Sequence, residues 1–103
     1  MIKVSVLYPT AEGKTLDIDY YKNKHFPMVL GLLGDRVKKA SIELGLSGPM
    51  PGSPPPFIAM GHLYFETLED FQAAMGIGGQ AIQDDIPNYT NAEMVIQVSE
   101  VVL

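Results

Sequence analysis

Apolar side chains alternate with a period of two in four segments of this chain and recur at helical spacing in two others, and this order most restricts the possible folds. The alternating segments predict strands at residues 2–8, 36–46, 57–65 and 92–101. The order strand, helix, strand, strand, helix, strand is the ferredoxin-like β-α-β-β-α-β arrangement. We therefore predict an α+β fold in which both helices cover one face of a four-stranded antiparallel sheet.

Local signals mark where the second predicted helix begins and where each of the two helices should be disturbed. Pro27 lies inside the first helix. Because the residue before a proline is pushed out of the α-helical region, we expect a break or kink near Phe26. The second helix should begin at Thr67, with Asp70 completing an arrangement close to a capping box. The glycine-rich run at 76–79 is expected to end or interrupt this helix.

A length of 103 residues predicts a single domain, residues 1–103, with a thin core. The sheet face without helices would carry several large apolar side chains. These are Leu7, Met60, Tyr64, Val95 and Val101. Because an apolar patch of that size is unfavourable in water, we expect a second copy to cover it, and a two-fold symmetric homodimer is the commonest arrangement.

Charge and cysteine content exclude several classes of function. The net charge of −5 disfavours contact with nucleic-acid phosphates. The chain has no cysteine, which excludes disulfides, thiolate nucleophiles and cysteine-based metal or iron–sulfur sites. A small domain without disulfides fits a reducing compartment, and the N-terminus lacks the features of a signal peptide, so we expect a cytoplasmic protein. No stretch is apolar enough to span a membrane.

The first candidate site lies late in the first predicted helix. Tyr21 and His25 are four positions apart and therefore share one helix face, with Tyr20 one step round from them. A histidine beside a tyrosine can shuttle protons, because histidine titrates near neutral pH. The alternative is structural: His25 would cap the end of the helix just before the break.

Two further groups of residues are candidates for a site. His62 shares a strand face with Met60 and Tyr64, although a lone histidine in a strand is usually a structural polar residue. The loop before the last predicted strand holds Asn88 and Tyr89, which either face a ligand or fix their own backbone. Two histidines without carboxylates near them in sequence make a poor metal site, so we expect no metal.

Two motifs resemble those of the EthD-like family. Residues 20–27, Tyr-Tyr-Lys-Asn-Lys-His-Phe-Pro, are similar to the family's Tyr-x-x-x-His-x-Pro signature. Residues 85–91, Asp-Ile-Pro-Asn-Tyr-Thr-Asn, resemble its second conserved stretch. The likeness in length, order of elements and motifs covers nearly the whole chain. It implies a dimeric α+β barrel, the fold of muconolactone isomerases and antibiotic-biosynthesis monooxygenases.

The resemblance also implies a site. The family's shared histidine maps onto His25, in a pocket between sheet and helices that Tyr21, His62 and Asn88 would line. The proline-rich loop 47–56 departs from the family pattern and is expected to cover or reshape the mouth of this pocket.

Two functions follow as expectations. The first is a cofactor-independent enzyme of isomerase, dehydratase, decarboxylase or monooxygenase type. It would act on a small apolar or aromatic metabolite, in xenobiotic or ether degradation, with His25 as general acid/base and Tyr21 or Tyr64 orienting the substrate. It requires an apolar pocket of roughly a few hundred Å³ beside His25. The alternative is a non-catalytic metabolite-binding or accessory protein with the same pocket.

Overall fold

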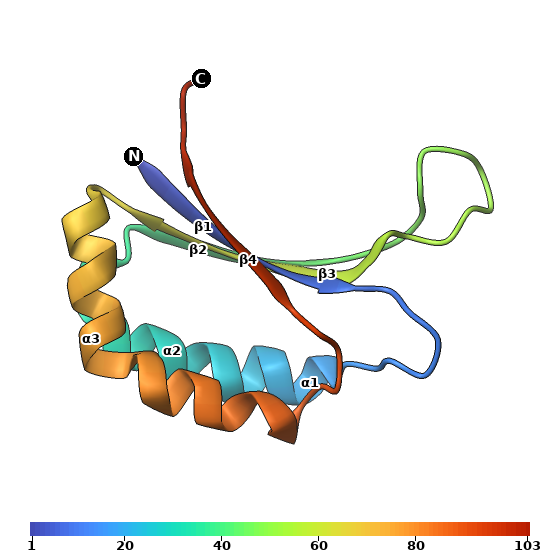
Figure 1. The fold of residues 1–103 in the computed structure, drawn as a ribbon, viewed down its shortest axis with the longest axis horizontal. Coiled ribbons are helices and arrows are strands. Elements are labelled where there is room, and N and C mark those ends of the chain that lie inside the picture. The colour runs from blue at the N-terminus through green and yellow to red at the C-terminus, as the bar shows by residue number, and fades with distance from the viewer.

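The structure is a computed structural model that describes residues 1–103, and it contains one antiparallel sheet with the helices on one side (Figure 1). The strands are β1 (Ile2–Pro9), β2 (Lys39–Leu44), β3 (Phe57–Phe65) and β4 (Val95–Glu100). The helices are α1 (Ile18–Tyr20), η1 (Tyr21–His25), α2 (Phe26–Leu33), η2 (Gly34–Arg36), α3 (Leu68–Asp85) and η3 (Ile86–Asn88). The strand order β2-β3-β1-β4 confirms the predicted ferredoxin-like α+β fold. None of the helices combines the length and the hydropathy needed to cross a membrane.

The bounds of the strands agree with the alternation pattern in the centre of the sheet and differ at its edges. β3 covers residues 57–65, as predicted. β2 begins at Lys39 rather than 36, because the preceding residues form the 3-10 helix η2. β4 begins at Val95 rather than 92. The backbone N–H of Ala92 instead donates to the hydroxyl of Thr90, at 3.1 Å.

Side chains on the helix-covered face of the sheet form the core. The register of β1 and β3 places Val4 opposite Leu63 and Tyr8 opposite Ala59, and all four residues are buried. Leu33 of α2 belongs to the same buried cluster. The residues that the alternation pattern placed on one face of β1 and β3 therefore do face the helices.

The first helix does not break near Phe26, and the disturbance expected there takes the form of a π-helical turn. α1, η1 and α2 follow one another without a gap, and η1 winds as a π-helix. The N–H of Phe26 donates to the carbonyl oxygen of Tyr21, five residues earlier. The wider π-helical turn makes room for the ring of Pro27, which clashes with a carbonyl group in a regular α-helix. His25 therefore lies inside a continuous helical segment and does not cap a helix end.

Helix α3 begins as predicted, but its glycines do not interrupt it. The N–H of Asp70 donates to Oγ1 of Thr67 at 3.1 Å. The helix then continues through the glycine run at 76–79. A Cβ atom at Gly78 would lie 3.1 Å from Cβ of Leu32 in α2. The absence of a side chain at Gly78 therefore lets the two helices pack closely.

The outer face of the sheet, away from the helices, is less apolar than predicted. A row of polar side chains crosses its middle at paired positions, and we call it the polar row: Gln97, Ser5, His62 and Ser41. The apolar row beside it consists of Leu7, Met60 and Val95, again at paired positions. The apolar side chains expected to require a second copy are thus divided by the polar row, with the apolar row on one side and the ring of Tyr64 on the other. Val101, the fifth of them, follows the end of β4 and is exposed.

The proline-rich loop 47–56 projects beyond the end of the sheet and away from the helices (Figure 1). A tight turn forms its tip, where the N–H of Ser53 donates to the carbonyl oxygen of Met50 at 3.1 Å. No residue of the loop lines the cavity between sheet and helices. The prediction that the loop covers the mouth of the pocket is therefore wrong for the single chain.

Candidate functional site

A small cavity lies between the helices and the covered face of the sheet. Sixteen residues line it, and fifteen of them are hydrophobic, the exception being His25. Val6 and Leu63 contribute from the sheet, Phe26 from α2 and Met75 from α3. The cavity volume of about 90 Å³ is smaller than the roughly few hundred Å³ expected for a ligand pocket.

The cavity reaches the surface along β4. Ile96 lines the cavity and is nevertheless 51% exposed, because β4 is the edge strand of the sheet. Met75 and Met94 also line it. Methionine side chains are flexible, so this lining can adjust to a ligand that is larger than the resting volume.

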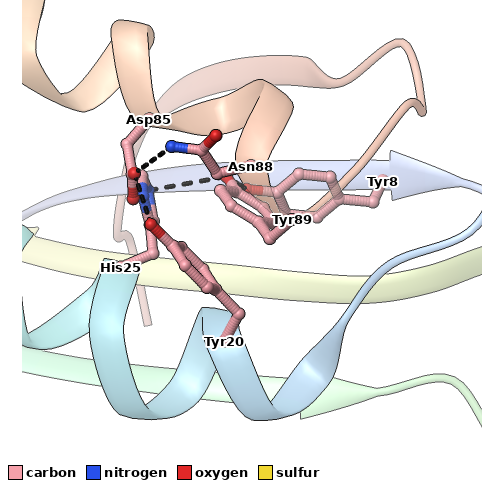
Figure 2. A network of polar contacts seen from close by, with 6 residues as sticks. All are labelled: Tyr8, Tyr20, His25, Asp85, Asn88 and Tyr89. Carbon is pink, nitrogen blue, oxygen red and sulfur yellow. Dashed lines mark hydrogen bonds and ion pairs between the residues drawn. The ribbon is translucent and has the colours of Figure 1, made fainter.

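His25 lies in the wall of this cavity with its ring almost fully buried. Figure 2 shows its contacts with Asp85 and Tyr89. Its Nδ1 is 2.8 Å from Oδ2 of Asp85, and its Nε2 is 3.5 Å from the hydroxyl of Tyr89. The ring also stacks on Tyr21, with 5.7 Å between the ring centroids. Side chains, and no backbone groups, therefore satisfy both ring nitrogens.

Asp85, the last residue of α3, orients the ring of His25. Its Oδ1 accepts hydrogen bonds from the hydroxyl of Tyr20 at 2.7 Å and from the amide of Asn88 at 2.9 Å. These two bonds, with a smaller contribution from His25, lower the pKa of Asp85 to about 2. The carboxylate is therefore ionised at neutral pH and accepts from Nδ1. Neutral His25 consequently carries its proton on Nδ1 and leaves Nε2 unprotonated.

Three tyrosine side chains gather next to His25. The hydroxyl oxygens of Tyr8 and Tyr89 are 2.7 Å apart. The ring of Tyr21 packs against both rings, at centroid distances of 5.4 Å from Tyr8 and 5.0 Å from Tyr89. Burial is the main cause that raises the pKa of all three hydroxyls. They therefore stay protonated at physiological pH and can donate hydrogen bonds.

β3 makes room for this cluster at Gly61. Gly61 lies in the middle of the sheet, opposite Val6 and Ile42, where glycine is usually unfavourable. A Cβ atom there would collide with the hydroxyl of Tyr21 and lie 3.3 Å from Cε1 of Phe26. The close approach of Tyr21 to the sheet thus depends on the missing side chain.

The structure brings together five of the predicted site residues and leaves two apart. Those in or directly around the cavity are Tyr20, Tyr21, His25, Asn88 and Tyr89. His62 and Tyr64 lie on the outer face of the sheet, because side chains alternate along β3 and those of Leu63 and Phe65 face the helices. The prediction that His62 and Tyr64 contribute to the same pocket is therefore wrong.

Two residues of the site were missed by the sequence analysis. Asp85 opens the stretch 85–91 that resembles the family's second motif, but its partner His25 is 60 residues away in the chain. Tyr8 is the last inward-facing residue of β1. The alternation of side chains along that strand does not show which residue the hydroxyl of Tyr8 contacts. The polar end of an inward-facing tyrosine, which normally needs a partner when buried, was the available signal.

Known proteins similar to this chain agree with the fold and the motifs. The family model described as EthD domain matches residues 15–93. The crystal structure of an EthD-like protein from Ralstonia eutropha JMP134 is 44% identical, with a TM-score of 0.93, over 99% of this chain and 92% of that one. No curated protein is similar enough in sequence to match.

More distant structures share the fold. An ethyl tert-butyl ether (EthD) family protein from Bacillus halodurans C-125 is 22% identical, with a TM-score of 0.74, over 99% of both chains. A dimeric ferredoxin-like protein of unknown function from Thermobifida fusca YX is 12% identical, with a TM-score of 0.60, over 97% of this chain and 90% of that one. The matched domain model and the 44% identity together establish that this chain belongs to the EthD family.

Proposed function

We propose that this protein is an acid–base enzyme that transfers a proton on a small, largely apolar molecule, with His25 as the general acid/base. The observation that carries the proposal is the surroundings of the His25 ring. Nδ1 is bonded to the ionised carboxylate of Asp85, whereas Nε2 adjoins an apolar cavity. A carboxylate that orients a histidine in this way is a recurrent arrangement in enzymes that move protons.

The chemistry available to this pair is the removal and return of a proton. Nε2 of His25 would take a proton from the ligand, and Asp85, 2.8 Å from Nδ1, would stabilise the imidazolium that forms. His25 would then deliver the proton to another atom of the ligand or to a leaving group. Isomerisation, dehydration and the protonation step of a decarboxylation all have this form.

The size and lining of the cavity support a compact, apolar ligand. A cavity of about 150 Å³ accommodates benzene, which exceeds the resting volume of 90 Å³ here. A small aliphatic molecule therefore fits most directly, and an aromatic one requires the methionine-containing wall to move. A role in ether or xenobiotic degradation remains part of this proposal, since the Bacillus halodurans relative carries ethyl tert-butyl ether in its family name.

We further propose a homodimer formed through the outer face of the sheet. The apolar row supports this assembly, since Val95 is 51% exposed in the single chain. The Thermobifida fusca relative, which is described as dimeric, has the same fold. In such a dimer the polar row would lie inside the interface, where its hydroxyl and amide groups can bond to those of the second copy.

The function can be tested by identifying the ligand and then following it. Native mass spectrometry of the purified protein detects a retained small molecule, and proton NMR in D₂O then follows its conversion or hydrogen exchange. We expect turnover to fall by about 10²–10⁴-fold in His25→Gln and to stay within about twofold in the matched control His62→Gln. Binding without conversion by the wild type, with only affinity altered in His25→Gln, would instead favour the accessory binding protein.

A further inference from the structure

The hydroxyl groups beside His25 form a chain with one direction. Nε2 of His25 is the unprotonated nitrogen, so it accepts from the hydroxyl of Tyr89, 3.5 Å away. The oxygen of Tyr89 then accepts from Tyr8 at 2.7 Å. The ring of Tyr21 packs edge-on against the ring of Tyr8, with 5.4 Å between the ring centroids. The proton at the end of this chain, on Tyr89, is the one nearest to the reactive nitrogen.

The last contact of the chain is also its weakest. A separation of 3.5 Å between Tyr89 and His25 is at the outer limit for a hydrogen bond, whereas 2.7 Å between Tyr8 and Tyr89 is short. A ligand oxygen can therefore accept a hydrogen bond from the hydroxyl of Tyr89 without disturbing the hydrogen bond between Tyr8 and Tyr89. Because bonds in a chain polarise one another, the hydrogen bond from Tyr8 makes Tyr89 a stronger donor.

We propose that Tyr89 donates its hydrogen bond to the carbonyl oxygen of the ligand, and that the ligand is a small neutral carbonyl compound with a hydrogen on the carbon next to the carbonyl group. This inference rests on the proposed function of His25 and assigns the substrate class for it. Tyr89 contacts the ligand, while the hydroxyl of Tyr8 strengthens Tyr89 as a donor and the ring of Tyr21 positions the ring of Tyr89.

The assignment defines a balanced step that needs no other reactant. Nε2 of His25 forms a bond to the hydrogen of the adjacent carbon as that C–H bond breaks. The electron pair moves into a new C=C bond, and the C=O bond becomes a C–O single bond whose negative charge is held by the hydroxyl of Tyr89. His25 then returns the proton to carbon, which restores the carbonyl group or moves a conjugated double bond.

The surroundings of the cavity select a neutral ligand. No lysine or arginine lines the cavity, and the carboxylate of Asp85 contacts Nδ1 of His25, not the nitrogen that adjoins the cavity. A carboxylate-bearing ligand would be buried without a counter-charge, which is costly. The single carbonyl group, in contrast, finds one donor in Tyr89 and otherwise apolar walls.

Acetone labelled with ¹³C at its carbonyl is a probe small enough to test this inference. Its carbonyl ¹³C shift moves to higher values when the oxygen accepts a hydrogen bond, and its methyl hydrogens exchange with D₂O when an enolate forms. For the wild type we expect a shifted bound signal and catalysed exchange. Tyr89→Phe should lose the shift and bind at least about tenfold more weakly, and Tyr8→Phe should reduce the shift while retaining binding. Tyr64→Phe, on the outer face, is the matched control and should behave as the wild type.

The outcomes separate this inference from the proposed function. Retention of the full shift in Tyr89→Phe, or no binding of acetone by the folded wild type, would overturn the carbonyl assignment. Equal binding of isopropanol, with the same dependence on Tyr89, would also overturn it in favour of an alcohol. A shifted signal in the wild type and in His25→Gln, without exchange in either, would support the carbonyl site and reject the acid–base function. Should Tyr89→Phe fail to fold, the reduced shift expected for Tyr8→Phe still decides the question.

Discussion

The two histidines of this chain are both buried, one on each side of the sheet, and their surroundings differ. His25 is 3% exposed, is paired with Asp85 and lines a cavity. His62 is 5% exposed, lies 3.0 Å from the hydroxyl of Ser5 and 3.4 Å from the carboxylate of Glu43, and lines no cavity. Each histidine thus has a carboxylate and a hydroxyl for partners. Only His25, on the side with the helices, adjoins a cavity, and its Nε2 has just the long 3.5 Å contact with Tyr89. The cavity beside this weakly bonded nitrogen distinguishes a candidate catalytic histidine from a structural one.

The largest effect should come from changing the carboxylate partner of each histidine. Asp85→Asn removes the acceptor that holds the Nδ1 proton of His25 and the charge that stabilises its imidazolium, so we expect kcat/KM to fall by about 100-fold or more. Glu43→Gln makes the matching change next to His62 and should leave kcat/KM within about twofold. Steady-state kinetics on the identified ligand, with both variants checked for native circular dichroism, measure this. Equal losses in the two variants would contradict the distinction between the two sides.

Packing on the two faces should respond differently to one added methyl group or one lost hydroxyl. Gly61→Ala forces the hydroxyl of Tyr21 away from β3, and overpacking of this kind costs about 1–3 kcal/mol. Ser41→Ala, in the polar row, should change the free energy of unfolding by no more than about 0.5 kcal/mol. Urea denaturation of both variants measures these values. A Gly61→Ala protein as stable as the wild type would show that the contact of Tyr21 with the sheet is easily replaced.

The outer face should be sensitive to charge if a second copy covers it. Leu7→Glu places a carboxylate in the apolar row, so we expect the dissociation constant of the homodimer to rise at least about tenfold. Ile77→Glu changes an exposed apolar residue of α3 and should leave the assembly as it is. Sedimentation velocity over a range of concentrations measures both. A wild-type protein that stays a monomer at micromolar concentration would refute the proposed dimer.

The smallest effect should be a pH dependence specific to the helix-covered side. The pKa of Asp85 is lowered from an ordinary value of 3.8 to about 2, chiefly by the hydrogen bond from Tyr20. Because the folded state binds this proton less readily than the unfolded state, Asp85 stabilises the fold above about pH 4 and loses this effect as the pH falls towards 2. The difference in urea midpoint between wild type and Asp85→Asn should therefore shrink from pH 5 to pH 2.5. A constant difference would argue against the lowered pKa.

The sequence was sufficient for the fold because the fold depends on local periodicity. The alternation in residues 57–65 reproduces β3, and the Thr67 cap reproduces the start of α3. The helical spacing of Tyr21 and His25 likewise placed them together in the site. The signal at Pro27 did not predict the local structure, because the helix accommodates the proline with a π-helical turn and continues.

The parts of the site that could not be predicted depend on contacts between distant segments. Asp85 reaches His25 only because α3 and the first helical segment pack side by side (Figure 1). The hydroxyl of Tyr8 contacts the hydroxyl of Tyr89, which lies 81 positions further along the chain. The separation of His62 from the site, in contrast, follows from the period of two in β3, which places His62 on the face of Met60 and Tyr64, away from the helices.

The central claim is that Asp85 fixes His25 with an unprotonated Nε2 at the cavity. Nitrogen-15 NMR of the histidine rings at about pH 9, where imidazole is normally neutral, tests it without any ligand. We expect His25 to carry its proton on Nδ1, and His62 to carry its proton on Nε2, because its Nδ1 faces the hydroxyl of Ser5 and its Nε2 faces Glu43. Opposite tautomers in the two rings, with the preference of His25 lost in Asp85→Asn, would support the account. A proton on Nε2 of His25 in the wild type would contradict it.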